Sequence, residues 1–424
     1  MEIIQYAGEH STLYMAGRLM IVLAFTASLL SAFSYIFSVY NTSEVSWIKI
    51  GRWAYGFHAL SVIGIFGLLY YIIYNHYFEF YYAWFHSSTT MPMRYIFACL
   101  WEGQEGSFLL WIFWQVVLAL FVMRRGGEWE SPVMAVIMLV QVFLSSMVLG
   151  LWIGDFHIGS NPFILLREHP DMQNMPFAQM PDYLKKITDG RGLNPLLQNY
   201  WMTIHPPTLF LGFASTVVPF AFALAGLIKG KVSEWIRPAL PYTFFGVMIL
   251  GTGILMGAAW AYEALSFGGF WAWDPVENSS LVPWIIFVGA AHLMLIVRKT
   301  GTAILTTLIL TVASFILVLY STFLTRSGIL GDSSVHAFTD LGMQGQLVVY
   351  MAFFTVLAIV LILINRKNIP ATKEEEAFSS REFWMFIGSL VLVISAVQIT
   401  ATTDRKSTRL NSSHVSESRM PSSA

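Results

Sequence analysis

About ten apolar runs, each long enough to cross a bilayer as a helix, constrain this chain more than any other feature. Hydrophobic residues make up 56% of the 424 residues and charged residues only 12%, which lies outside the range of soluble globular proteins. The net charge of −1 gives no indication of nucleic-acid binding. We therefore predict an all-α, polytopic membrane helical bundle with spans at residues 13–38, 54–74, 107–123, 133–153, 209–228, 241–260, 281–297, 303–324, 347–364 and 383–403.

The basic residues predict how this bundle is oriented. Most of them fall in alternate short connections, which the positive-inside rule assigns to the cytoplasm. The connections at 154–208 and 325–345, and the one between the sixth and seventh spans, then share the external face. The first span follows a polar start without a basic region or cleavage site, so we expect it to be retained rather than removed as a signal peptide.

Residues 267–278 form an unusual connection between the sixth and seventh spans. Two glycines, four aromatic rings and two carboxylates lie within these twelve residues. An interfacial belt also collects Trp and Tyr, but it has no need of Gly-Gly and Asp-Pro. Flat aromatic faces beside polar anchors suit a large planar ligand, and we interpret the segment as a platform for one. Its ring faces are Phe270, Trp271 and Trp273, with Trp260 and Trp284 near its rim.

Two histidines flank this platform in the predicted topology. His205 precedes two prolines, which stiffen the backbone at the external mouth of the fifth span. His336 lies in the external connection after the eighth span. A lone loop histidine is usually a surface or hydrogen-bonding residue. Two that meet beside a ring-rich loop are candidate axial ligands to the iron of a planar macrocycle.

His292 differs from these because it lies inside the seventh span, where an ionisable side chain is costly and marks a site. One interpretation is a hydrogen bond to a neighbouring helix. The other is an axial ligand to an intramembrane haem. Such an iron needs a second ligand, for which His58, near the cytoplasmic end of the second span, is a weak candidate.

The remaining polar residues divide into structural and binding candidates. Asp274 and Glu277 would repel an anionic ligand, so we expect them to cap the following helix, with Asp274-Pro275 as the N-cap and first-turn pair. Arg326, beside the His336 connection, is a candidate partner for a propionate. The single cysteine, Cys99, excludes an internal disulfide, so thiol chemistry must use a partner's cysteines.

Several motifs resemble the CcmF-type haem lyases of the WWD-domain haem-handling family, which act in cytochrome c biogenesis. Residues 273–280, followed by Pro283 and Trp284, are similar to the tryptophan-rich signature of that family. Residues 101–107 match its Trp-Gly-x-His-Glu-Gly-Ser segment, and 194–198 lead into 205–207 as in the family. Residues 260–263 and 323–328 precede the platform and the His336 connection in the same order.

The resemblance implies an assembly factor or enzyme, a cytochrome c synthetase-type haem lyase that works within a complex. It would receive haem from a chaperone at the external membrane face and promote thioether bonds to the Cys-x-x-Cys-His motif of apocytochrome c. Thiol-reducing and other maturation subunits would be its partners, in the inner membrane of a bacterium with the platform facing the periplasm. His205 and His336 would flank the platform as ligands of the haem in transit, and His292 would bind a resident b-type haem.

The sequence departs from the family pattern at several positions. Gln104 stands where the family has a histidine, and Phe270 and Ala272 replace aromatic or tryptophan positions. The family's second b-haem ligand lies downstream of residue 424, so we expect this chain to lack it. We expect residues 1–403 to form the haem-handling membrane domain, with the platform at 262–284. The polar, serine-rich residues 404–424 are expected to be a non-native tail.

Two other classes of protein fit parts of the pattern. A polytopic transporter, of haem or of another substrate, would also have many spans, a buried histidine and Gly or Pro breaks. The sequence shows no inverted repeat, and the distinctive residues cluster at the surface instead of the midplane. An electron-transferring haem subunit needs paired intramembrane histidines, and only His292 is convincing. An absorbance spectrum separates these classes, because a transporter without haem has no Soret band.

Overall fold

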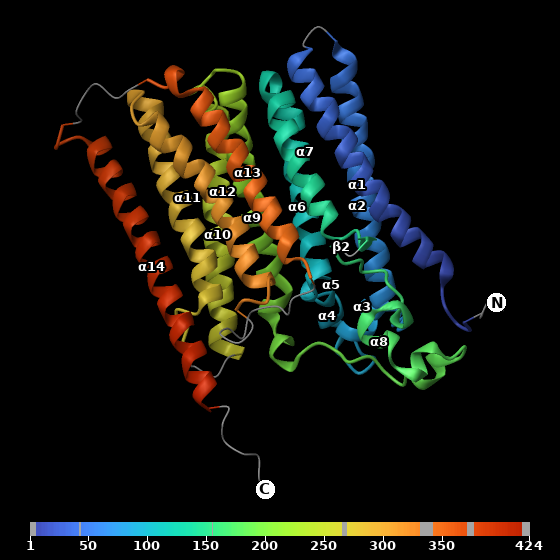
Figure 1. Ribbon diagram of the computed structural model, residues 1–424. Helices are drawn as coiled ribbons and strands as arrows, with labels where there is room; N and C mark the ends of the chain where they lie inside the picture. Colours follow the sequence, from blue (N-terminus) through green and yellow to red (C-terminus); the bar gives the residue numbers. More distant parts are fainter. Residues whose placement is uncertain are drawn as a thin grey trace. The chain divides into compact units, whose positions relative to one another are not determined.

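A computed structural model describes residues 6–41, 44–154, 156–264, 269–330, 342–370 and 377–417, with side chains as far as Thr403. Ten helical segments within these residues are long and apolar enough to cross a membrane, which confirms the all-α class and the predicted number of spans (Figure 1). Their helices are α1 (Ser11–Tyr40), α2 (Val45–Tyr74), α6 (Gln104–Arg125), α7 (Glu130–Ser146), α9 (Tyr200–Ile228), α10 (Ile236–Ala264), α11 (Pro275–Thr300), α12 (Ile304–Arg326), α13 (Gln344–Ile364) and α14 (Arg381–Glu417).

Short elements fill the longer connections. They are α3 (Tyr81–His86), α4 (Met93–Ile96), α5 (Cys99–Glu102), α8 (Pro170–Gln173), six 3₁₀ turns and the strands β1 (Leu151–Ile153) and β2 (Phe156–Ile158). The 3₁₀ turns lie at Gly127–Trp129, Leu166–Glu168, Pro176–Gln179, Tyr183–Lys186, Pro195–Leu197 and Arg366–Asn368.

The chain divides into two compact units, of which the first holds α1 to α6, most of α7 and the chain as far as Phe210. Its α1–α2 hairpin is tightly packed because small residues let the helices approach. The Ser31 hydroxyl donates to the Gly51 carbonyl at 2.9 Å, and Gly51 lies against the Tyr35 ring. The buried Tyr55 hydroxyl of α2 donates to the Val116 carbonyl of α6 at 2.7 Å, which ties the hairpin to the third span.

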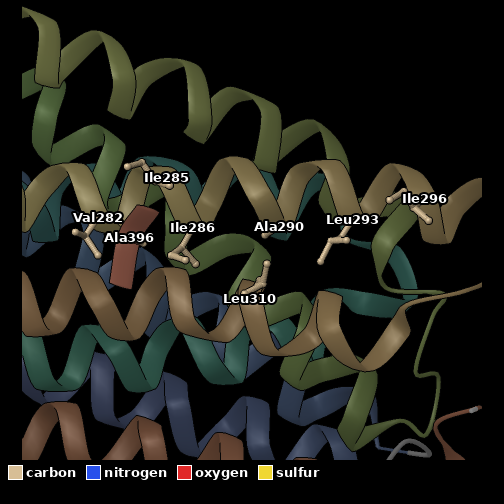
Figure 2. Packing of buried hydrophobic residues seen from close by; sticks show 8 residues of the cluster. All are labelled: Val282, Ile285, Ile286, Ala290, Leu293, Ile296, Leu310 and Ala396. Atoms are coloured by element: carbon tan, nitrogen blue, oxygen red, sulfur yellow. The ribbon is translucent and has the colours of Figure 1, made fainter. Parts of the chain in front are cut away.

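The second unit holds the rest of α9 and helices α10 to α14, with α11 packed against both α12 and α14. Figure 2 shows apolar side chains spaced along α11 that meet Leu310 of α12 and Ala396 of α14. Trp284 of α11 lies against Gly251 of α10, where a Cβ atom would come within 2.8 Å of the indole nitrogen. This packing holds the start of α11, and therefore the platform before it, in a fixed framework.

Several span boundaries differ from the prediction. Helices α2 and α9 each begin nine residues before the predicted start, so His58 lies near the middle of α2 and not close to its end. The fourth span was expected to run to residue 153, but α7 ends at Ser146 and residues 151–153 form a strand. Gly150 adopts a φ of +63°, which the helix cannot continue through. The seventh span was expected to begin at residue 281, but α11 begins at Pro275 because the polar residues 278–280 form helical turns ahead of the apolar run.

Candidate haem site

The platform turn ends in a helix cap formed by Asp274 and Glu277. The Asp274 carboxylate accepts from the Val276 N–H at 2.8 Å, and Glu277 reaches back to accept from the Asp274 N–H at 3.2 Å. Pro275 occupies the first helical position, where its missing N–H costs nothing. The prediction that Asp274 and Glu277 act as capping residues, with Pro275 at the first position, is confirmed.

Side chains of the first turn of α11 also hold the backbone ahead of it. Glu277 accepts a second hydrogen bond, from the Ala272 N–H at 2.9 Å. The Asn278 amide donates to the Trp273 carbonyl at 3.2 Å and to the Thr403 hydroxyl of α14 at 2.8 Å. The backbone of residues 272–274 is therefore shaped by α11 itself, with a tie to the last span.

Trp273 needs these ties because its φ is +57°, in the left-handed region that side chains other than Gly, Asn and Asp rarely adopt. That conformation costs roughly 1–2 kcal/mol. It turns the indole outward, so that Trp273 is 54% exposed. Trp271 is half-buried, and its ring meets that of Trp273 edge to face with centroids 6.2 Å apart. A strained residue displaying a large ring at a fixed turn is characteristic of a functional site.

Phe270 provides a second exposed face, together with a ring from α10 that was not among the predicted site residues. Tyr262, at the end of α10, stacks on Phe270 with centroids 4.5 Å apart and planes within 1°. Both rings remain about half exposed. Tyr262 belongs to the motif at 260–263, but nothing in the sequence indicates that the two rings are parallel.

Three polar atoms near the turn are buried and have no hydrogen-bond partner among the described residues. They are Nε1 of Trp271, Oε1 of Glu277 and Oδ1 of Asn278. An unpaired buried donor or acceptor costs about 1–3 kcal/mol, so such atoms are usually satisfied by a ligand or by water. Aromatic faces beside unsatisfied donors and acceptors fit a planar macrocycle with a polar edge.

His292 lies in α11, 17 residues after Pro275, and at 1.5 Å per residue this is about 26 Å along the helix. Its Nδ1 is 2.9 Å from the Val288 carbonyl, and since a carbonyl only accepts, Nδ1 carries the proton. The lone pair is therefore on Nε2. A backbone carbonyl that fixes the tautomer in this way is the usual setting of a histidine that binds a metal. His292 therefore has the tautomer that ligation of a haem iron through Nε2 requires.

His58 has the same tautomer in the other unit. It is fully buried, Nδ1 donates to the Ala24 carbonyl of α1 at 2.8 Å, and Nε2 has no partner among the described residues. His58 was the weak candidate for a second ligand to the haem iron that His292 would bind. The two histidines belong to different compact units.

His205 lies within α9, not in a loop before it, because the helix begins at Tyr200 and runs through both prolines. Pro206 has no N–H, so the Met202 carbonyl four residues earlier loses its helical donor. The indole N–H of Trp101 replaces that donor at 3.0 Å. A tryptophan from the motif at 101–107 therefore secures the turn that carries His205. His336 lies outside the described residues.

The other candidate residues are more enclosed. The Trp284 indole N–H donates to the Val247 carbonyl of α10 at 2.9 Å. Trp260 is 9% exposed, and Arg326, the last residue of α12, is 4% exposed. Their contacts with a ligand stay predictions.

The chain matches known proteins over most of its length. The family model described as "Cytochrome C assembly protein" matches residues 101–330. The cytochrome c-type biogenesis protein CcmF of Pseudomonas fluorescens is 31% identical over 390 residues, covering 90% of this chain and 54% of that protein. CcmF of Escherichia coli K12 is 31% identical over 318 residues, covering 74% and 45%. A solved structure entitled "Cytochrome c Heme Lyase CcmF" superimposes with a TM-score of 0.71 at 23% identity, over 95% of this chain and 58% of that one.

The chain is therefore a multi-pass membrane protein of the cytochrome c assembly protein family. Within that family it is of the CcmF type, as the sequence motifs predicted. It spans about half the length of the curated relatives that it matches.

Proposed function

We propose that this protein acts in cytochrome c maturation, where it presents haem at the external membrane face for thioether ligation to a Cys-x-x-Cys-His motif of apocytochrome c. The observation that carries the proposal is the strained, capped turn at 272–277, which displays Trp273 outward in a chain of the CcmF type. A transporter or an electron-transferring subunit needs no such external turn.

The haem in transit is the substrate, and the protein's work on it is positioning. Addition of a thiol across a vinyl group breaks the S–H bond and the vinyl π bond and forms one C–S and one C–H bond, with no net oxidation. Orientation of the two partners therefore supplies much of the rate. Phe270, Trp271 and Trp273 would hold the porphyrin face. Asp274 and Glu277 bond to backbone N–H groups, which limits their repulsion of the haem propionates. Arg326 would offset propionate charge.

His205 and His336 would be the axial ligands of this external haem. Support for His205 comes from its place on a helical turn that Trp101 secures through Met202. A ligand held by helix and tertiary contacts gives the iron a defined approach, as substrate positioning requires.

His292 would hold a resident b-type haem through Nε2, in the tautomer that the Val288 carbonyl sets. A bound b-type haem supplies one-electron transfer. The chain's own contribution is the orientation of the imidazole in the membrane.

Thiol chemistry would come from the partners. Burial raises the pKa of the Cys99 thiol to about 12, and a protonated, enclosed thiol is a poor nucleophile. The proposal therefore includes a thiol-reducing subunit as well as a haem chaperone, in the inner membrane of a bacterium with the platform on the periplasmic side.

The test uses single alanine variants of His205 and His336 in a full-length protein. Each should abolish cytochrome c maturation while the protein remains inserted, and His157→Ala, a half-buried histidine outside the platform, should not. Normal maturation in both platform variants would contradict the assignment. In the same protein, His292→Ala should weaken a six-coordinate b-type spectrum or convert it to five-coordinate, and the absence of any Soret band in the parent would favour a transporter.

A further inference from the structure

A short β-hairpin, which no sequence pattern indicated, follows α7. β1 and β2 pair antiparallel, with Leu151 opposite Ile158, Trp152 opposite His157 and Ile153 opposite Phe156. Residues opposite one another share a face of the ribbon. Leu151, Ile153 and their partners therefore form one entirely apolar face. Trp152 and His157 occupy the other face, with ring centroids 4.4 Å apart.

Both faces of the hairpin are open. Leu151 is 39% exposed, Trp152 64%, Ile153 62% and Phe156 78%. A two-stranded ribbon is at best marginally stable in water, and one that exposes large apolar side chains on both faces needs a covering. A flat protein partner would cover one face, whereas lipid surrounds both.

The base of the hairpin is fixed to the end of α7. The Ser160 N–H donates to the Met147 carbonyl at 2.9 Å, and the Asn161 amide donates to the Leu149 carbonyl at 3.1 Å. Gly159 packs so closely on the Ser146 and Met147 backbone that no other residue fits there without a shift. Because α7 forms the last part of a membrane span, its end lies at the bilayer boundary. Strands of three residues extend about 10 Å from that base, which keeps the hairpin at interfacial depth.

We propose that the β1–β2 hairpin is a membrane-interface anchor, which inserts Trp152, Ile153 and Phe156 among lipid headgroups and upper acyl chains beside α7. The occupant is the lipid bilayer, because the base of the hairpin adjoins the end of a helix that is long and apolar enough to span a membrane. The mixture of Trp and Phe with aliphatic side chains is that of interfacial anchors. This anchor would fix the depth of the polar connection that follows it.

The test measures immersion depth with spin labels in nanodiscs that contain phosphatidylcholine and phosphatidylglycerol. The only cysteine, Cys99, is buried and is replaced by serine, which retains a donor for the Tyr95 carbonyl. Labels are then placed at Phe156→Cys or Ile153→Cys, and at Lys185→Cys as the matched control. Lys185 lies in the same unit and outside the spans, with its side chain 78% exposed.

Power saturation with oxygen and with a water-soluble nickel chelate reports the surroundings of each label. Anchoring predicts an oxygen-to-nickel accessibility ratio several-fold higher at positions 153 and 156 than at 185. Nickel accessibility at 156 equal to that at 185 would overturn the proposal, because the hairpin would then lie in water. A label that is immobilised, hidden from both reagents and broadened by a second spin would overturn it in favour of a contact with a second copy of the chain.

Discussion

Replacement of Trp101 by phenylalanine tests how the turn that carries His205 is held. The indole N–H is the donor that replaces the one Pro206 lacks, at 3.0 Å from the Met202 carbonyl. Trp101 is 3% and Met202 9% exposed, so water has little access to the orphaned carbonyl. A buried acceptor left without a donor costs about 1–3 kcal/mol, which is roughly a 5- to 150-fold change in the folding equilibrium.

The control is Trp284→Phe, which removes the same atoms from a partly buried contact between α11 and α10. The Trp284 indole N–H also donates to a carbonyl, that of Val247. Gly251, four residues further on in α10, has an N–H, so this carbonyl keeps its helical donor. The Trp284 variant should lose only the net value of one hydrogen bond, about 0.5–1.5 kcal/mol, beyond the packing loss common to both.

Equilibrium unfolding of both variants in mixed micelles gives the comparison. Trp101→Phe should be the more destabilised, and hydrogen exchange should rise at the amides around His205. Equal losses in the two variants, or unchanged exchange in the first turns of α9, would refute the role given to the missing proline N–H.

Three further predictions concern other fixed points of the structure. Gly106→Ala should prevent folding, because its Cβ would collide with the Leu100 carbonyl, and a variant purified at the parental yield would contradict this. Glu277→Ala should cost about 0.5–2 kcal/mol and alter the tryptophan fluorescence of the platform, whereas an unchanged spectrum would mean that other contacts set the turn. Burial of Asp189 opposes its ionisation, but hydrogen bonds from the Thr89 N–H and hydroxyl and from its neighbour's N–H lower its pKa. The ionised carboxylate therefore stabilises the fold at pH values above the unfolded-state pKa of about 3.9. This stabilisation is lost as the pH falls through the lower folded-state pKa. Hydrogen exchange at the Thr89 amide should rise only below about pH 4. The variant Asp189→Asn should abolish this pH dependence. If the pH dependence persists in the variant, a group other than Asp189 causes it.

The spans could be predicted from the sequence because bilayer thickness imposes a length that the apolar runs display directly. Their ends could not, since a polar turn such as residues 278–280 continues a helix once its side chains find partners. Ser279, for example, accepts from the Ser321 hydroxyl of α12 at 2.9 Å. The hairpin after α7 was missed for a related reason. Its first strand is as apolar as the span, and the positive φ at Gly150 lies between the end of α7 and that strand.

The parts of the candidate site that depend on neighbouring residues could be predicted from the sequence. The parts that depend on contacts between distant segments could not. Asp-Pro followed by Glu three residues later is a local signal for a helix start, and it predicted the cap. The pairing of Trp101 with the carbonyl freed by Pro206 joins residues about a hundred positions apart. The stacking of Tyr262 on Phe270 depends on how α10 ends. Neither leaves a pattern in one sequence.

The platform is in effect an extended helix cap, and this explains how acidic residues can adjoin a surface proposed for an anionic substrate. The N-terminus of α11 carries the positive end of the helix dipole and unsatisfied N–H groups. Asp274 and Glu277 direct carboxylate oxygens at backbone N–H groups of residues 272–276, so much of their charge is compensated locally. The same bonds hold Trp273 in its strained conformation. One pair of carboxylates therefore both starts the helix and fixes the ring, and the aromatic face is only as rigid as the first turn of α11.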